Sequence, residues 1–179
     1  WLLRAVIPMQ MFASILACFL LCAALALLYN LARIDLKTRL LPNKLVFPFA
    51  LLGVLFHAVL SFGLLPLSAM MIGAALGGGI LLGIRTLANA FYKQDTLGLG
   101  DVKLMAAAGL WLGPDVLLAL TLGAVAGLLH GLGVALWTHH KNKQPVNLAR
   151  LEIPAGPGFI VGILIGAAVK FQSLPTLLF

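Results

Sequence analysis

The sequence contains few charged residues. Asp, Glu, Lys and Arg make up only 9% of its 179 residues, whereas hydrophobic residues make up 62%. An ordinary soluble domain is about one quarter charged and about half apolar. The composition therefore excludes a water-soluble globular enzyme and indicates an integral membrane protein. Six bilayer-spanning helices of about 20 residues would use roughly 120 residues, so no second, soluble domain would fit.

Cysteine is also scarce, and the common catalytic and nucleotide-binding motifs are absent. Cys18 and Cys22 lie four residues apart in one apolar run, which places them on one helix face rather than in a disulfide or a metal site. None of the four histidines belongs to an H-E-x-x-H pattern, and no G-x-S-x-G or P-loop sequence occurs. We expect neither a metal nor a cofactor.

Acidic residues are fewer than basic residues, with five Asp and Glu against 12 Lys and Arg. In so apolar a chain, this excess of positive charge is expected in loops that face the cytoplasm and anionic lipid, and not in a nucleic-acid-binding surface. The expected partners are therefore the lipid bilayer and a substrate, with no nucleic acid.

Long apolar runs predict an all-α, polytopic membrane protein with about six transmembrane helices. Lys and Arg gather after the first, third and fifth runs, which places those loops in the cytoplasm and both termini on the other side of the membrane. The fourth run would rise only about 18 Å as a helix, less than the bilayer core, so the acid at its start is expected at the edge of a membrane cavity. The six runs cover residues 8–34, 44–62, 67–88, 101–112, 114–137 and 157–171.

Glycine recurs at every fourth position in three of these runs. Small residues at this spacing let membrane helices approach closely, so a tightly packed bundle is predicted. The glycines are Gly73 and Gly77, then Gly123, Gly127 and Gly131, then Gly162 and Gly166.

Two of the five acids occupy positions that suit a catalytic pair. Asp35 closes the first predicted helix and Asp101 opens the fourth, on the same predicted side of the membrane. Two facing aspartates can divide the work of peptide hydrolysis, one as the base that activates water and one as the acid that polarises the carbonyl. Gly98 and Gly100 would let the backbone of an extended substrate come close. Ordinary solvated positions are expected for Asp95, Asp115 and Glu152.

The segments 35–43 (DLKTRLLPN) and 98–103 (GLGDVK) resemble the paired signature of the bacterial prepilin peptidases, the type IV leader peptidases of the GxGD aspartic protease class. The segment 153–159 (IPAGPGF) is similar to a Pro/Gly turn before the last helix of that family, where I-P-F-G-P is more usual. The resemblance covers roughly residues 25–170.

This resemblance implies a catalytic role for Asp35 and Asp101. It further implies that residues 1–179 form a single integral-membrane peptidase domain. Its substrates would be type IV prepilins or type II secretion pseudopilins, whose leaders it would cleave at the cytoplasmic face of the bacterial inner membrane. Many relatives also have an N-terminal region with two CxxC pairs and methylate the new pilin N-terminus. Since that region is missing here, the chain resembles the short, peptidase-only forms, unless Trp1 is the truncated end of a longer chain.

Three basic residues near the two acids are candidate supporting residues. Lys37 and Arg39 could contact lipid phosphate or a substrate carboxylate, although positive-inside placement alone also explains them. Lys103, two positions after Asp101, is expected on another helix face, extending toward the membrane interface.

Two alternative functions stay open at this point. A presenilin-type intramembrane protease shares the GxGD motif, but the shorter chain and the segment 35–43 argue against it. A small transporter could use paired carboxylates to relay protons, because buried acids also mark ion pathways. Such a transporter would move protons or solute in liposomes without cleaving any peptide.

Overall fold

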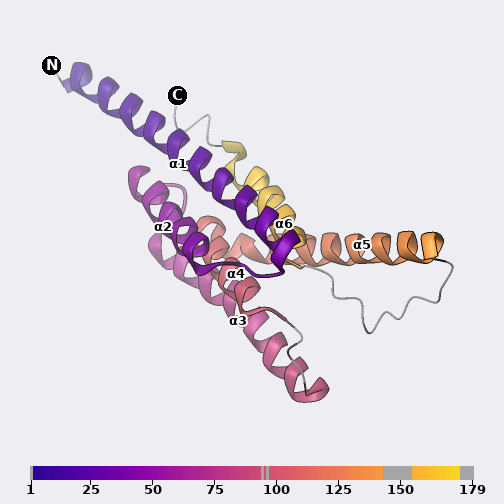
Figure 1. Ribbon diagram of the computed structural model, residues 1–179. Helices are drawn as coiled ribbons and strands as arrows, with labels where there is room; N and C mark the ends of the chain where they lie inside the picture. The colour runs from indigo at the N-terminus through magenta and orange to yellow at the C-terminus, as the bar shows by residue number, and fades with distance from the viewer. Residues whose placement is uncertain (1, 94, 96, 143–154, 174–179) are drawn as a thin grey trace.

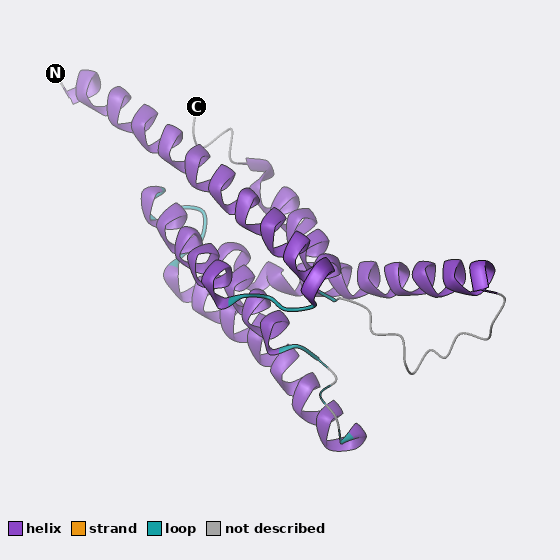
Figure 2. Ribbon diagram, viewed as in Figure 1, coloured by secondary structure: helices purple, strands orange, loops and turns teal. Residues whose placement is uncertain are grey.

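The computed structural model describes residues 2–93, 95, 97–142 and 155–173, and every regular element among them is helical (Figures 1 and 2). The predicted all-α class is confirmed, and each of the six apolar runs corresponds to one α-helix. The elements are α1 (Leu2–Thr38), α2 (Asn43–Val59), α3 (Leu67–Tyr92), α4 (Leu99–Leu112), η1 (Gly113–Asp115), α5 (Val116–Asn142), α6 (Gly156–Lys170) and η3 (Phe171–Ser173).

Three stretches of the described chain are long and apolar enough to cross a membrane. They are Gln10–Thr38, Leu67–Tyr92 and Leu99–Trp137, the last of which includes α4, η1 and most of α5. Helices α2 and α6 are apolar but shorter, with 17 and 15 residues. These lengths support a polytopic membrane protein, while the number of six spans stays a prediction.

Helix α4 is the centre of the bundle. It packs along α3 and also contacts α2 and α6, and most of its side chains are buried. It begins at Leu99 and ends before Gly113, where φ is 62°, a left-handed conformation that glycine adopts without strain. The short fourth run is thus a short helix, and its apolar character on all sides suits burial inside a bundle.

The other helices surround α4 as two closely packed pairs and one long helix. Helix α3 pairs with α4 and α5 pairs with α6, while α1 lies against α2 and α6. The second half of α5 projects beyond the bundle (Figure 1), where Leu128 and Trp137 are 72% and 65% exposed. In a membrane protein, such apolar surface is available to lipid or to another apolar helix.

Glycines bring the paired helices into backbone contact. A Cβ atom added at Gly73 or Gly77 would collide with backbone oxygens of η1 and α4. A Cβ atom at Gly123 would lie 2.9 Å from Cα of Phe159, and one at Gly162 would collide with the backbone of α5. Since real Cβ atoms do not come so close to backbone, the close packing predicted from the glycine spacing is confirmed for these two pairs.

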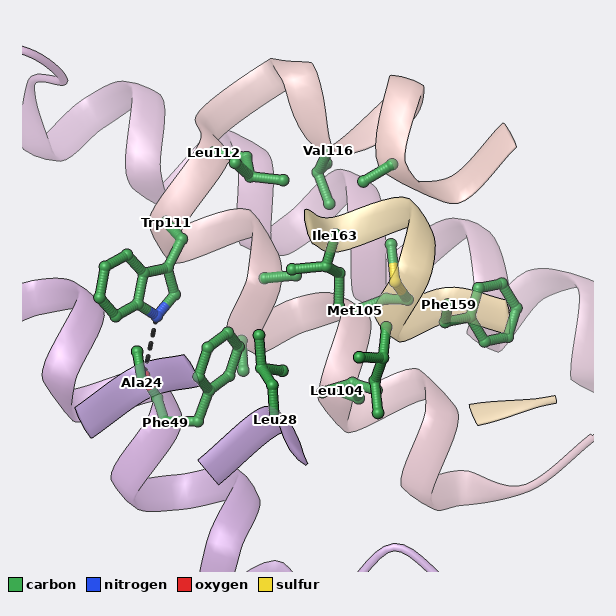
Figure 3. Close-up of a cluster of buried hydrophobic side chains, with 14 of the residues drawn as sticks. Ala24, Leu28, Phe49, Leu104, Met105, Trp111, Leu112, Val116, Phe159 and Ile163 are labelled. Carbon is green, nitrogen blue, oxygen red and sulfur yellow. Dashed lines mark hydrogen bonds between the residues drawn. The ribbon is translucent and has the colours of Figure 1, made fainter. Parts of the chain in front are cut away.

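Trp111 of α4 contacts α2 in the core through a hydrogen bond and a stacked ring. Its indole Nε1 donates a hydrogen bond of 2.9 Å to the carbonyl oxygen of Phe49, and its ring stacks on that phenyl ring at 5.6 Å between centroids (Figure 3). The backbone carbonyl oxygen of Trp111 in turn accepts a hydrogen bond of 3.0 Å from Nε2 of His57, which is fully buried. This second bond pairs a carbonyl at the C-terminal end of α4 that has no partner within the helix.

We expect Trp111→Phe to destabilise the bundle by about 2 kcal/mol, because it removes a buried hydrogen bond and leaves space beside the smaller ring. Thermal unfolding of the detergent-purified protein measures this effect. Phe91→Leu is a suitable control, since Phe91 is 81% exposed. Equal unfolding midpoints for Trp111→Phe and the parent would contradict the prediction.

Candidate active site

Asp35 lies in the last turn of α1, with its side chain inside the protein. The helix ends at Thr38, and the N–H of Arg39, which has φ of 56°, donates to the Asp35 backbone carbonyl at 2.8 Å. This closure is typical of a helix C-terminus. Asp35 is only 4% exposed, and its Oδ2 has no hydrogen-bond partner among the described residues. A buried carboxylate oxygen without a partner is costly, and in a membrane protein it indicates a functional role.

Asp101 lies in the first turn of α4 and is also buried, at 8% exposure. Its backbone N–H donates to the Gly98 carbonyl at 3.2 Å, and its Oδ1 has no partner in the described part of the chain. A Cβ atom added at Gly98 would lie 3.0 Å from Oδ2 of Asp101. Glycine at position 98 therefore leaves room for the carboxyl group, which is a structural role separate from the predicted approach of a substrate.

The structure brings the two acids to the same end of the bundle. The segment after α1 packs onto the start of α4, where a Cβ atom added at Gly100 would lie 2.7 Å from Cβ of Leu41. Asp35 is close enough to Asp101 for its charge to act on the second carboxyl group. Their catalytic roles, and the role of Gly100 toward a substrate, stay predictions.

The three predicted supporting residues are all exposed. Lys37 lies in the last turn of α1, and Arg39 directly follows the helix. Lys103 is exposed whereas Asp101 is buried, so the two side chains lie on different faces of α4, and Nζ of Lys103 donates to Oδ1 of Asn43 at 3.1 Å. This bond joins the second turn of α4 to the start of α2, and thus joins the two acidic segments of the sequence.

Lys103→Ala and Asn43→Ala are each expected to lower peptidase activity several-fold, and the double variant to lower it no further, because all three lose the same contact. Rates from single-turnover cleavage of a prepilin would measure the effect. Independent, multiplicative losses would show that the two residues act separately. As an exposed contact, the pair should add less than about 1 kcal/mol to stability.

Arg85 of α3 holds the segment that leads into Gly98. Its guanidinium donates to the Leu97 carbonyl oxygen and forms an ion pair of 2.6 Å with Asp95. Nδ2 of Asn89 donates to the same Asp95 oxygen at 3.0 Å. This anchor was not predicted from the sequence. The available signal was a single Arg in an otherwise apolar helix, which requires an acceptor nearby.

The remaining acids do not join the pair. Asp95 is 80% exposed at its side chain, and Asp115 pairs with Lys170 at 2.6 Å at the other end of α4. Glu152 falls outside the described residues.

The first turn of α6 also reaches Asp35. The backbone of Gly156 lies against the Asp35 carboxyl group, since a Cβ atom added at Gly156 would be only 2.6 Å from Oδ2. Gly156 was recognised in the sequence only as part of the Pro/Gly turn 153–159, with no role assigned to it. Composition could not reveal this contact, because 120 residues separate the two positions.

The chain matches the model of the Type IV leader peptidase family over residues 15–132. It is similar to the "Prepilin leader peptidase/N-methyltransferase" of Aeromonas salmonicida (strain A449), with 33% identity over 156 residues, which cover 84% of this chain and 50% of that protein. The proteins with the same name from Escherichia coli (strain K12) and Burkholderia pseudomallei (strain K96243) are 34% and 36% identical, over 76% and 89% of this chain and 56% and 47% of their own lengths.

The chain spans about half the length of these curated relatives. No solved structure is a significant match. The matched residues 15–132 make up most of the chain and include both Asp35 and Asp101. The family predicted from the two acidic segments is confirmed, and this chain belongs to the type IV leader peptidase family.

Proposed function

We propose that this chain is a prepilin peptidase, a membrane aspartic endopeptidase that removes the leader from type IV prepilins or pseudopilins. The observation that carries the proposal is the pair of buried carboxyl groups, Asp35 and Asp101, each with one oxygen that lacks a partner among the described residues. Membership of the family, and relatives named as prepilin leader peptidases, support the class of substrate.

The pair suits general acid–base hydrolysis of a peptide bond. One carboxylate removes a proton from a water molecule, whose oxygen attacks the scissile carbonyl carbon. The other carboxyl group, protonated, donates to the carbonyl oxygen and thus stabilises the tetrahedral intermediate. When the C–N bond breaks, the proton taken from water passes to the leaving amine. Oδ2 of Asp35 and Oδ1 of Asp101, which have no partner among the described residues, are the atoms that we assign to these contacts.

We place the active site at the cytoplasmic face of the bacterial inner membrane, in a single peptidase domain of six spans over residues 1–179. The positive-inside rule supports this orientation, because the end of the bundle that holds Asp35 is rich in basic residues. These are Arg33, Lys37, Arg39 and Lys44. In this arrangement Lys37 and Arg39 would lie where lipid phosphate or an acidic group of the substrate can approach them.

The substrate would arrive as a membrane-embedded helix whose leader junction unwinds beside the pair. An extended backbone is needed there, because a helical peptide bond is shielded by its own turns. The exposure of Gly98, directly before α4, supports close approach of such a backbone at the Asp101 side.

Incubation of the detergent-purified protein with a prepilin tests this function. We expect the substrate to lose a mass equal to its leader, as measured by mass spectrometry of the intact product. A chain that leaves the prepilin intact, but moves protons or solute across liposome membranes, would instead be a transporter.

A further inference from the structure

The approach of α6 to Asp35 is unusually close. A Cβ atom built on Gly156 would lie 2.6 Å from Oδ2, 2.8 Å from Cγ and 3.4 Å from Cβ of Asp35. The first two separations are shorter than real Cβ atoms show, so only glycine fits at position 156 while the carboxyl group keeps this position. Gly156 is buried, as is Asp35.

The local sequence makes the Gly156 amide an available donor. Gly156 opens α6, where backbone N–H groups have no acceptor inside the helix. The next residue, Pro157, has no N–H to offer. The Gly156 N–H is therefore placed to donate to the Asp35 carboxyl group, and the positive end of the α6 dipole lies beside the acid.

Helix α6 cannot easily withdraw from Asp35. A Cβ atom at Gly158 would lie 2.7 Å from the backbone nitrogen of Gly127, and Gly162 contacts the backbone of α5 just as closely. Two backbone contacts thus fix α6 on α5 within two turns of Gly156. A methyl group at position 156 would consequently displace the Asp35 side chain rather than the helix.

We propose that Gly156 is a positioning residue for Asp35: its lack of a side chain admits the carboxyl group to the first turn of α6, and its N–H holds that group in the orientation used for cleavage. The kinetic part of this inference rests on the proposed peptidase function. The structural part, a direct steric coupling between positions 156 and 35, does not.

The kinetic test compares Gly156→Ala with Gly79→Ala in the full chain, with a prepilin as substrate. A Cβ atom at Gly79 meets nothing within 4 Å, so that variant should match the parent. For Gly156→Ala we expect kcat to fall by about tenfold or more, with KM within about twofold, because a misplaced acid impairs the chemistry and not the docking of the substrate. An unchanged kcat, or a loss confined to KM, would overturn the proposal.

A stability cycle tests the coupling without any activity measurement. Gly156→Ala should lower the thermal unfolding midpoint in the parent, but have little effect in an Asp35→Ala background, where only the Cβ at 3.4 Å remains in contact. If Gly156→Ala alone yields no folded protein, the double variant should restore it. Equal losses in both backgrounds would overturn the proposal. A parent that cleaves no prepilin would refute the proposed function, and the cycle would still decide the role of Gly156.

Discussion

Asp35→Asn and Asp101→Asn will each abolish prepilin cleavage, with a loss of about 1,000-fold or more, because an amide can neither accept nor donate the catalytic proton. Each amide has nearly the same shape as the carboxyl group that it replaces, so both variants should insert into the membrane and purify like the parent. Single-turnover cleavage of a prepilin measures the loss, and thermal unfolding verifies the fold.

The other described acids provide matched controls. Asp95→Asn removes an exposed ion pair with Arg85, and Asp115→Asn removes one with Lys170. Exposed ion pairs add little to stability, and neither acid lies at the Asp35–Asp101 pair, so both variants should retain most activity. Cleavage within tenfold of the parent by either Asp35→Asn or Asp101→Asn would exclude the catalytic assignment.

Gly73→Leu will prevent the bundle from folding, or lower its stability by at least about 3 kcal/mol, because the new side chain would enter space that backbone atoms already occupy. A Cβ atom at Gly73 alone would collide with the carbonyl oxygens of Gly109 and Gly113. Backbone cannot change rotamer to make room, so α3 and α4 must separate, and α4 carries Asp101.

Gly79→Leu is the matched control on the same helix. A Cβ atom at Gly79 meets nothing within 4 Å, and leucine favours the helical conformation more than glycine does. The yield of monodisperse protein and the thermal unfolding midpoint should separate the two variants clearly. Similar midpoints for Gly73→Leu and Gly79→Leu would show that the helices α3 and α4 are not closely packed.

The helical segments were predictable because their signal is local. Each apolar run ends at charged residues or at a Pro/Gly turn, and the structure places a helix on every run. The apolar helices that are long enough to cross a membrane were predictable from hydropathy alone. The exact membrane spans were not predictable. Helices α2 and α6 are shorter than a bilayer requires, and α4 is buried among other helices. Hydropathy cannot distinguish a helix buried in protein from one exposed to lipid.

The acids were predictable as candidates because so few occur in this chain, and each needs a reason to lie near an apolar segment. The residues that position these acids were not predictable. Arg85 binds the Leu97 carbonyl across a turn, and Gly156 reaches Asp35 from the far end of the chain. Such contacts depend on how helices cross, and the crossing is set by packing at many positions together.

The sequence by itself determined the helical class, the long apolar segments, the close packing at spaced glycines and the choice of Asp35 and Asp101 as candidate residues, because composition, periodicity and spacing show which groups avoid water and which need it. Only the tertiary structure decided which helix ends meet. It brought the end of α1, the start of α4 and the start of α6 together, so that Gly156 lies against Asp35 and Gly98 leaves room for Asp101. The physical reason is that the position of each carboxyl group depends on backbone separations to within about a few tenths of an ångström. These separations are set when helices pack through their glycine faces, and no local sequence pattern encodes them.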